Sequence, residues 1–346
     1  MDDWEQTTTM SHRELSHYVS DFSRYRVAVL GDLMIDRYVW GRASRISQEA
    51  PVPVVAVQHE NAVPGGAANV ARNVVSLGAK AEVLGVVGDD HDGRELCRLL
   101  GECQVDTSQV LVVPGRRTTV KTRVLAANQQ VVRIDYEDTE ALPAAAYRQL
   151  LGRLERRLQS GEIDALILED YAKGVFTRSF IKAAIALANR YQVLVTLDPH
   201  PSHGFNVSGL ALMTPNRAEA FVLAGIGYQP GINDPCRDRP LRRVGAALQR
   251  KWRVSQLLLT LGAEGMALFG AAGEDPVHIP TRAQQVFDVS GAGDTVMATM
   301  VLALLAGAPA SAAATIANYA AGVVVGIVGT AAIEAAVLRQ RLQEEE

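Results

Sequence analysis

Cysteine and net positive charge are both scarce in this sequence. Its 346 residues contain only three cysteines, Cys97, Cys103 and Cys236, and their spacing is not that of a metal site. Reduced thiols in a cytoplasmic protein are the simplest interpretation. The formal net charge is −4 and the pI is near 6.0, so no overall basic field argues for a nucleic-acid partner. Any anionic ligand must therefore be held by local groups.

Long hydrophobic runs are also missing. The first residues, Met1–Glu5, are acidic and do not lead into the apolar segment of a signal peptide. The run Val296–Ala306 has about half of the roughly 20 residues needed to cross a bilayer. The range 316–337 is longer, but glycines, Asn318 and Glu334 interrupt it, which predicts helix and strand within a protein core. We therefore expect no membrane segment and a cytoplasmic location.

The common nucleotide-binding fingerprints are absent as well. There is no Gly-x4-Gly-Lys-Ser/Thr, which excludes a P-loop. The triplet Gly291-Ala292-Gly293 lacks the third glycine of a dinucleotide fingerprint and lies near the C-terminus rather than after the first strand. A nicotinamide cofactor is not expected.

The sequence does have a regular alternation of apolar, β-branched runs and amphipathic helices, starting at Arg26–Asp32. This alternation predicts an α/β fold with a central, mostly parallel sheet flanked by helices. Several predicted strands end in polar residues that should meet at one edge of the sheet, where ligands bind in such folds: Asp32, Asp170, Asp198, Asn216 and Thr260. We expect an N-terminal extension over residues 1–24 and a single domain over 25–346.

Two β-rich segments do not fit the central sheet. Val52–Val57 alternates and carries prolines, which indicates an edge strand, and Thr118–Asp135 has the pattern of a hairpin. Together they predict a small separate sheet with strands at about 36–61 and 112–136. Because exposed edge strands tend to be covered, we expect this sheet to serve as a lid or as the interface of a homodimer.

The stretch Asp288–Thr295 is the strongest candidate for chemistry. Gly291, Ala292 and Gly293 precede an apolar helix, so unpaired N–H groups and the helix dipole would favour an anion there. Asp294 places a carboxylate beside that anion. Such a carboxylate suits a base that takes a proton from a hydroxyl attacking phosphorus. The stretch is equally compatible with a tight turn and a first-turn aspartate that complements the dipole.

Two further helix starts carry polar residues. Gly65 and Gly66 would allow close approach of a ligand, and Asn69, one turn on, can donate to and accept from a hydroxyl. Helix-start chemistry alone is the alternative. Asn216 and Glu219 would share a helix face and could hold Mg²⁺ beside nucleotide phosphates. Taken alone, this pair is better explained as a capping box.

Taken together, these motifs resemble the ribokinase-like (PfkB) sugar kinases. Gly65–Asn69 and Asp288–Thr295 are similar to the two signatures of that family, in the same order. Asn216–Glu219 and Thr260–Gly265 are similar to its nucleotide-side motifs. The resemblance covers roughly residues 25–340 and implies ATP as phosphoryl donor, Mg²⁺ as cofactor and a small-molecule sugar as acceptor.

The resemblance also implies roles for individual residues. Asp294 would be the catalytic base, and Gly291, Ala292 and Gly293 would form the anion hole. The nucleotide and Mg²⁺ would contact Asn216, Arg217, Ala218, Glu219, Thr260, Gly262, Gly265 and Asn318, with Glu219 reaching the metal through water. The sugar would contact Asp32, Gly65, Gly66 and Asn69. Lys121, Arg123, Asn128 and Arg45 would hold the sugar and a second phosphate on it. For any single basic residue, a solvated strand face is the alternative.

Within this family, Gly31–Tyr38, Ser44–Val54 and Asn128–Gln130 resemble the kinases of ADP-heptose synthesis. That resemblance implies ATP-dependent phosphorylation of D-glycero-β-D-manno-heptose 7-phosphate at O1, for the inner core of lipopolysaccharide. Because the sequence stops at Glu346, we expect a stand-alone kinase. The alternatives are a kinase of another sugar phosphate, of the fructose or tagatose type, and a non-catalytic sugar-phosphate-binding regulator. The presence of Asp294 argues against the regulator.

Overall fold

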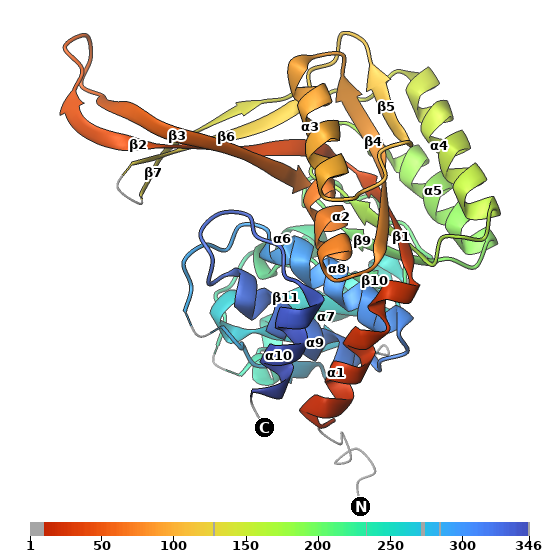
Figure 1. Ribbon diagram of the computed structural model, residues 1–346. Coiled ribbons are helices and arrows are strands. Elements are labelled where there is room, and N and C mark those ends of the chain that lie inside the picture. The colour runs from red at the N-terminus through yellow and green to blue at the C-terminus, as the bar shows by residue number, and fades with distance from the viewer. Residues whose placement is uncertain (1–9, 127–128, 233, 271–273, 284, 345–346) are drawn as a thin grey trace, which may run out of the picture.

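A large, mostly parallel sheet forms the centre of the molecule (Figure 1). The computed structural model describes residues 10–126, 129–232, 234–270, 274–283 and 285–344. Within these residues nine strands pair in the order β13-β12-β11-β10-β9-β8-β1-β4-β5, parallel from β5 to β11 and antiparallel at β12 and β13. Their bounds are β1 (Arg26–Gly31), β4 (Lys80–Gly88), β5 (Val110–Val113), β8 (Ala165–Glu169), β9 (Leu194–Asp198), β10 (Leu212–Met213), β11 (Gln256–Thr260), β12 (Met266–Phe269) and β13 (Val277–Ile279).

Helices cover both faces of this sheet because its strands are apolar on both sides. Along β1, Val27 and Val29 belong to one hydrophobic core and Ala28 and Leu30 to the other, as alternation along a strand requires. The first core is covered by α1 (His12–Ser20), α2 (Ala67–Ser76), α3 (His91–Glu102), α8 (Ala292–Leu305), α9 (Ala310–Val324) and α10 (Ala335–Gln343). The second is covered by α4 (Ala144–Gln159), α5 (Arg178–Arg190), α6 (Arg217–Ala224) and α7 (Arg239–Trp252). The expected α/β architecture is confirmed.

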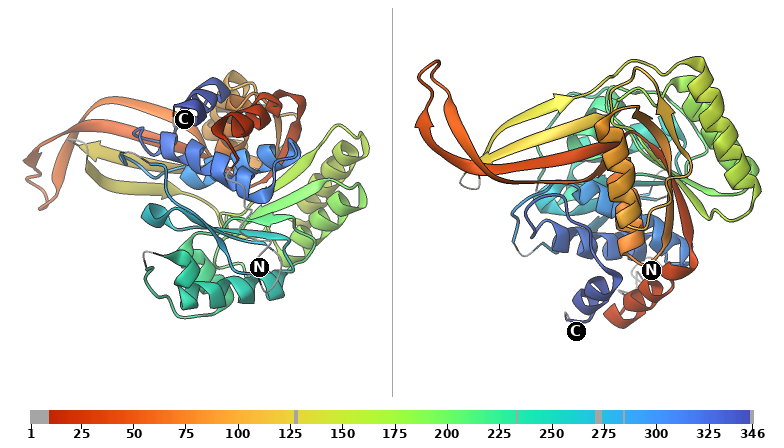
Figure 2. Two further views of the ribbon diagram at one scale, coloured as in Figure 1. Left: turned by 90° about the horizontal axis from the view of Figure 1, so that it is seen from below. Right: turned by 45° about the horizontal axis from the view of Figure 1, so that its top comes forward.

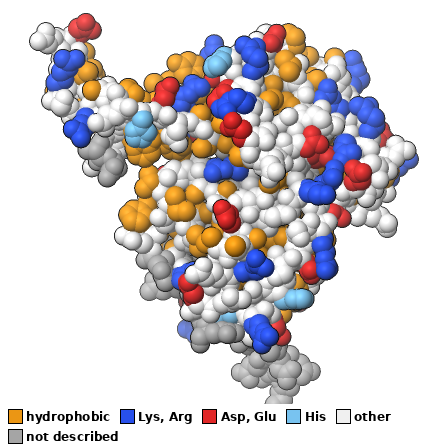
Figure 3. Space-filling model, in the orientation of Figure 1, with side chains coloured by type: hydrophobic (Ala, Val, Ile, Leu, Met, Phe, Trp, Pro, Cys, Tyr) orange, Lys and Arg blue, Asp and Glu red, His pale blue; other side chains and the backbone are white. Residues whose placement is uncertain are grey.

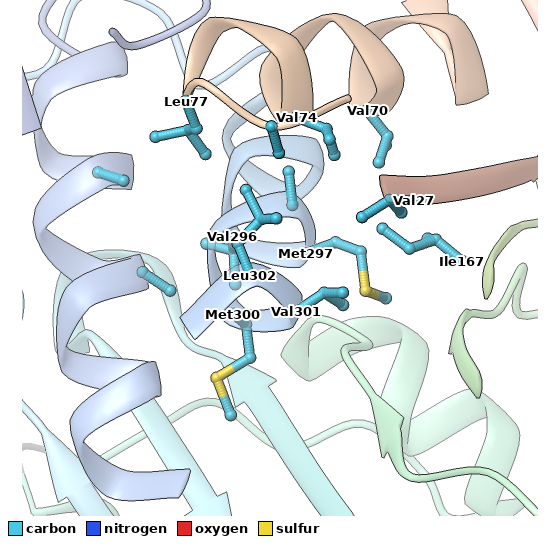
Figure 4. Close-up of a cluster of buried hydrophobic side chains, with 14 of the residues drawn as sticks. Val27, Val70, Val74, Leu77, Ile167, Val296, Met297, Met300, Val301 and Leu302 are labelled. Carbon is cyan, nitrogen blue, oxygen red and sulfur yellow. The ribbon is translucent and has the colours of Figure 1, made fainter. Parts of the chain in front are cut away.

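Helices α2 and α8 pack against each other, and their starts lie close together. Val70 and Val74 of α2 face Met297 of α8 above the sheet (Figure 4). A buried hydrogen bond also joins the two helices: the Thr295 hydroxyl of α8 donates to Asn73 Oδ1 of α2 at 2.9 Å. This packing fixes two glycine-led helix starts side by side at the carboxyl edge of the sheet.

A second sheet projects from the body, with strands in the order β3-β2-β6-β7 (Figures 1 and 2). Its strands are β2 (Leu33–Ile46), β3 (Pro53–Gly66), β6 (Thr119–Ala126) and β7 (Gln129–Tyr136). As the sequence indicated, β3 is an edge strand and β6 pairs antiparallel with β7. The expected small separate sheet is therefore present, and we call it the projecting sheet.

One expected strand is not found. Between α9 and α10 the residues from 325 to 334 form turns and extended loop, and none of them pairs as a strand. Gly326 and Gly329 lie in this turn, and Gly329 has a positive φ of 83°. Among the described residues, no helix combines the length and hydropathy that crossing a membrane requires.

Candidate active site

Asp294 lies at the point where the two helix starts meet the end of β8. It occupies the first turn of α8 and is only 7% exposed. Asn69 Nδ2 donates to its Oδ2 at 2.6 Å, and the Tyr171 hydroxyl donates to its Oδ1 at 2.6 Å. Asn69 Oδ1 is buried without a hydrogen-bond partner in the described part of the chain, which leaves an acceptor for a ligand hydroxyl. The structure thus brings Asn69 and Asp294 into direct contact.

Opposing effects act on the Asp294 carboxyl. Burial raises its pKa most, the hydrogen bonds from Tyr171 and Asn69 lower it, and the nearby charges of Asp36 and Lys121 act in opposite directions. The balance leaves the pKa above its usual value. A carboxylate with a raised pKa is a better proton acceptor than an ordinary surface aspartate, which suits a general base.

The start of α8 offers donors to an anion. Gly291 is the N-cap residue with φ of 79°, and a Cβ there would lie 2.9 Å from Asn69 Nδ2. Gly293 is exposed, with open space where a Cβ would point. The Ala292 N–H donates to Val289 O at 3.2 Å, so it is partly engaged. Of the two donors expected for an anion, the Gly293 N–H is therefore better placed than that of Ala292.

Asp36 is a site residue that the sequence analysis left out of its candidates. It lies on β2 opposite Lys121 of β6, is buried, and pairs with Arg123. A Cβ at Gly65 would lie 2.7 Å from Asp36 Oδ2, so only glycine allows this carboxylate to approach β3. The available signal was its position four residues after Asp32, at the start of the projecting sheet.

Asp32 was expected to hold sugar hydroxyls, and the structure gives its carboxylate other partners. Its Oδ2 accepts from the N–H groups of Tyr171 and Lys173, at 2.9 and 3.1 Å, and its Oδ1 from Val175. Burial raises the pKa of Asp32 to about 6, although these N–H groups oppose the shift. Asp32 therefore positions the loop after β8, including Tyr171, and Asp36 is the carboxylate that borders Gly65 of β3.

The basic candidates separate into two groups. Lys121 Nζ lies 5.3 Å from the centre of the Tyr171 ring, and Arg123 contacts Asp36, so both join the site. Arg45 is exposed near the far end of β2, nine residues beyond Asp36, or about 30 Å along a strand. The structure does not bring Arg45 to Asp294 of the same chain. Asn128 lies outside the described residues.

The nucleotide-side motifs converge at the ends of β10 and β11. Asn216 forms an isolated parallel bridge with Thr260, and it caps α6 in a capping box with Glu219, with distances of 2.8 and 3.0 Å. The capping interpretation is therefore correct, and it leaves the exposed Asn216 and Ala218 at the surface. The Arg217 guanidinium is turned away and pairs with Asp238, so any ligand contact from Arg217 would come from its main chain.

The remaining nucleotide-side candidates border the same region. Gly262 and Gly265 have φ of 63° and 85°, and a Cβ at Gly265 would lie 2.2 Å from Ile279 O. Asn318, on α9, is buried and donates to Pro280 O at 2.6 Å. Asn318 thus fixes the segment that follows β13, and its amide is at least partly committed to the protein.

Two carboxyl groups, Glu169 and Asp198, lie at the ends of the neighbouring strands β8 and β9. Glu169 is 0% exposed, and neither of its carboxylate oxygens has a hydrogen-bond partner among the described residues. Burial raises the pKa of Glu169 well above its usual value, and the adjacent Asp198 and Asp294 raise it further. Burial likewise raises the pKa of Asp198, with Glu219 adding to the effect. The two Glu169 oxygens are carboxyl ligands of the kind that Mg²⁺ takes, whereas Asp198 Oδ1 already accepts from the Thr214 hydroxyl at 3.3 Å. The described residues contain no group of three close His, Cys, Asp or Glu ligands.

A mostly parallel sheet in this order, with a buried carboxylate at the start of α8 and a projecting sheet beside it, is the arrangement that the sequence resemblance to sugar kinases implies. A profile of the pfkB family carbohydrate kinases matches residues 24–336, and the chain belongs to this family. The family resemblance and the ribokinase-like fold expected from the sequence are confirmed.

The most similar relatives include two proteins named "Bifunctional protein HldE". The one from Trichlorobacter lovleyi is 41% identical over 311 residues, which is 90% of this chain and 61% of that protein. The one from Geobacter metallireducens is 44% identical over 308 residues, 89% of this chain and 61% of that protein. The chain thus spans about three-fifths of the length of these relatives.

Solved structures with a similar fold include Arabidopsis thaliana ribokinase in complex with ribose and ATP. Its TM-score is 0.72 at 20% identity, covering 92% of this chain and 99% of that one. Phosphofructokinase-2 from Escherichia coli has a TM-score of 0.72 at 18% identity, with coverage of 92% and 99%. These similarities establish the fold.

Proposed function

We propose that this protein is an ATP-dependent kinase that phosphorylates D-glycero-β-D-manno-heptose 7-phosphate at O1, in ADP-heptose synthesis for lipopolysaccharide. The observation that carries the kinase chemistry is the buried Asp294 carboxylate, held by Tyr171 and Asn69 at the N-terminus of α8. The resemblance of Gly31–Tyr38 and Ser44–Val54 to heptose-phosphate kinases, together with the similarity to the HldE proteins, supports the substrate.

In this reaction Asp294 accepts the proton of the acceptor hydroxyl as its oxygen attacks the γ-phosphorus of ATP, and ADP leaves. The N-terminal N–H groups of α8, with Gly293 foremost, stabilise the charge on the transferred group. Asn69 Oδ1 and the Asp36 carboxylate are placed to accept hydrogen bonds from sugar hydroxyls. When bound, Mg²⁺ would neutralise the nucleotide phosphates, and Glu219, with Glu169 and Asp198 behind it, would hold it directly or through water.

A sugar-phosphate panel tests this proposal. ATP consumption is measured with heptose 7-phosphate, fructose 1-phosphate, fructose 6-phosphate and ribose, and the heptose product is examined for a phosphate on O1. We expect the highest kcat/KM with heptose 7-phosphate. An equal or higher kcat/KM with a fructose phosphate would contradict the proposed substrate. An absence of turnover with every sugar would contradict the proposed kinase activity.

We also propose a homodimer formed through the projecting sheet, and a cytoplasmic site of action, where ATP and sugar phosphates are found. The support for the dimer is the row of exposed apolar side chains on β7, which is an edge strand.

A further inference from the structure

The loop between α9 and α10, residues 325–334, connects the projecting sheet to the start of α8. Its residue Thr330 is only 7% exposed and contacts three segments that are far apart in sequence. These segments are β2, the turn before α8, and α2, from which Arg72 donates to the Thr330 carbonyl at 3.1 Å. Thr330 therefore lies between the strand that carries Asp36 and the helix that carries Asp294.

Tyr38 of β2 holds Thr330 through two hydrogen bonds. The Thr330 N–H donates to the Tyr38 hydroxyl oxygen at 3.1 Å, and the two hydroxyl oxygens lie 2.7 Å apart. The Thr330 hydroxyl donates to Asp36 Oδ2 at 3.4 Å, so the hydrogen between the two hydroxyls comes from Tyr38. Burial raises the pKa of Tyr38, which keeps the phenol a donor. Because Tyr38 is only 2% exposed, water cannot readily replace a lost partner.

The other side of Thr330 lies against the start of α8. A Cβ added to Gly291, the N-cap residue of α8, would lie 2.9 Å from Thr330 Cγ2. The preceding residue of the loop is tied to the same turn, because the Gly329 N–H donates to Asp288 Oδ2 at 3.0 Å. Asp288 Oδ1 accepts from the Ser290 N–H at 2.9 Å. A shift of this loop would therefore move the turn that leads into α8.

We propose that Tyr38 and Thr330 are positioning residues that fix the first turn of α8 relative to Asp36. In the proposed reaction, Asp36 accepts from sugar hydroxyls and the Gly293 N–H stabilises the transferred phosphoryl group. These two groups must lie at a set distance, because a misplacement of about 1 Å can lower a rate roughly 100-fold. The Tyr38–Thr330 pair spans the gap between them. This inference rests on the proposed function for the acceptor and for the role of the α8 start.

Tyr38→Phe and Thr330→Val each remove one hydroxyl and nearly keep the size of the side chain. With the sugar phosphate that the wild type turns over best, each should lower kcat about 10- to 100-fold and leave the KM for ATP within about threefold. Thr330→Ser, which keeps the hydroxyl, should retain a higher kcat than Thr330→Val. Because both hydroxyls belong to one link, the double variant should fall no further than the lower single variant. Tyr18→Phe, on α1, is the matched control and should change nothing.

Hydrogen–deuterium exchange of the unliganded protein gives a readout that does not depend on turnover. In Tyr38→Phe, exchange should become faster in residues 286–295 as well as in 325–334, and stay unchanged in α4. Unchanged exchange in 286–295 would refute the positioning role, and so would losses of kcat that multiply in the double variant. A lower melting temperature with wild-type kcat would also refute it, because the role would then be structural only.

The outcomes separate this inference from the proposed function. A wild type that phosphorylates none of the sugars would contradict the kinase proposal, while the exchange result would still decide whether Tyr38 positions the start of α8. If the wild type is an active kinase and both single variants keep its kcat, the positioning role is refuted and the kinase proposal stands.

Discussion

A buried carboxylate can act as a base only if its negative charge is stabilised and it can still accept a proton. Asp294 meets both conditions through two short hydrogen bonds that come from different parts of the chain, Asn69 on α2 and Tyr171 after β8. The phenol of Tyr171 stays a donor, because burial and the neighbouring carboxylates raise its pKa well above the usual value. The pKa of Asp294 is therefore lowered by hydrogen bonds from two residues that are far from it in sequence.

Asp294→Asn tests the base directly. The amide keeps the size of the side chain and can still accept from Tyr171, but it cannot take a proton. We expect kcat to fall roughly 10²- to 10⁴-fold with little change in the KM for ATP. Steady-state ATP consumption measures this, and Asp275→Asn, at an exposed aspartate paired with Arg242, serves as the control. Turnover of Asp294→Asn close to that of the wild type would contradict the assignment.

Tyr171→Phe should shift the pH dependence of the rate. The tyrosine hydroxyl lowers the pKa of Asp294, so its removal leaves the burial effect less opposed and the pKa rises. Because the base works only when deprotonated, the acidic limb of the kcat–pH profile should move to higher pH, and activity should recover on raising the pH. A profile that falls uniformly without a shift would show that Tyr171 does not act through Asp294.

At the scale of elements, the start of α6 combines a structural role with the proposed functional one. Asn216 and Glu219 form a reciprocal capping box, and Glu219 also lies near enough to Asp198 to raise its pKa. A capping residue and a metal-facing carboxylate are therefore not exclusive interpretations of this motif. They can be separated, because capping needs an acceptor oxygen whereas Mg²⁺ needs negative charge.

Glu219→Gln makes that separation. Glutamine retains a carbonyl oxygen for the Asn216 N–H, so the free energy of unfolding should change by less than about 1 kcal/mol. The lost charge should raise the Mg²⁺ concentration needed for half-maximal activity by roughly 10-fold or more. Glu219→Ala, which removes both functions, should in addition lower the melting temperature. A normal Mg²⁺ requirement in Glu219→Gln would leave capping as the sole role of this residue.

The elements and their motifs were predictable from the sequence because strand ends and helix starts carry local signals. The carboxyl-edge positions of Asp32, Asp170 and Thr260 and the two glycine-led helices follow from such signals. The partners of individual side chains were not predictable, because they depend on packing between distant segments. Asp32 and Asp36 are four residues apart and look alike in sequence, but only the packing of the side chains shows that the Asp36 carboxylate lies against Gly65.

At the scale of the whole molecule, the projecting sheet exposes several large apolar side chains on its two edge strands. Val132, Ile134 and Tyr136 on the edge strand β7 are 47%, 43% and 48% exposed, and Val57 on the opposite edge strand β3 is 59% exposed. Hydrophobic side chains are visible on this sheet and on the body beneath it (Figure 3). An exposed apolar edge strand favours association with another chain, and the proposed homodimer would bury it.

Val132→Lys combined with Ile134→Lys places two charges on one face of β7, because residues two apart on a strand point the same way. If the projecting sheets form the dimer interface, burying these charges is unfavourable, and the double variant should be monomeric while the wild type is dimeric. Light scattering coupled to gel filtration measures the mass of each. Val112→Lys, on the edge strand β5 of the central sheet and 52% exposed, should remain dimeric. A double variant that stays dimeric would show that the interface lies elsewhere. A monomeric wild type would contradict the proposed dimer.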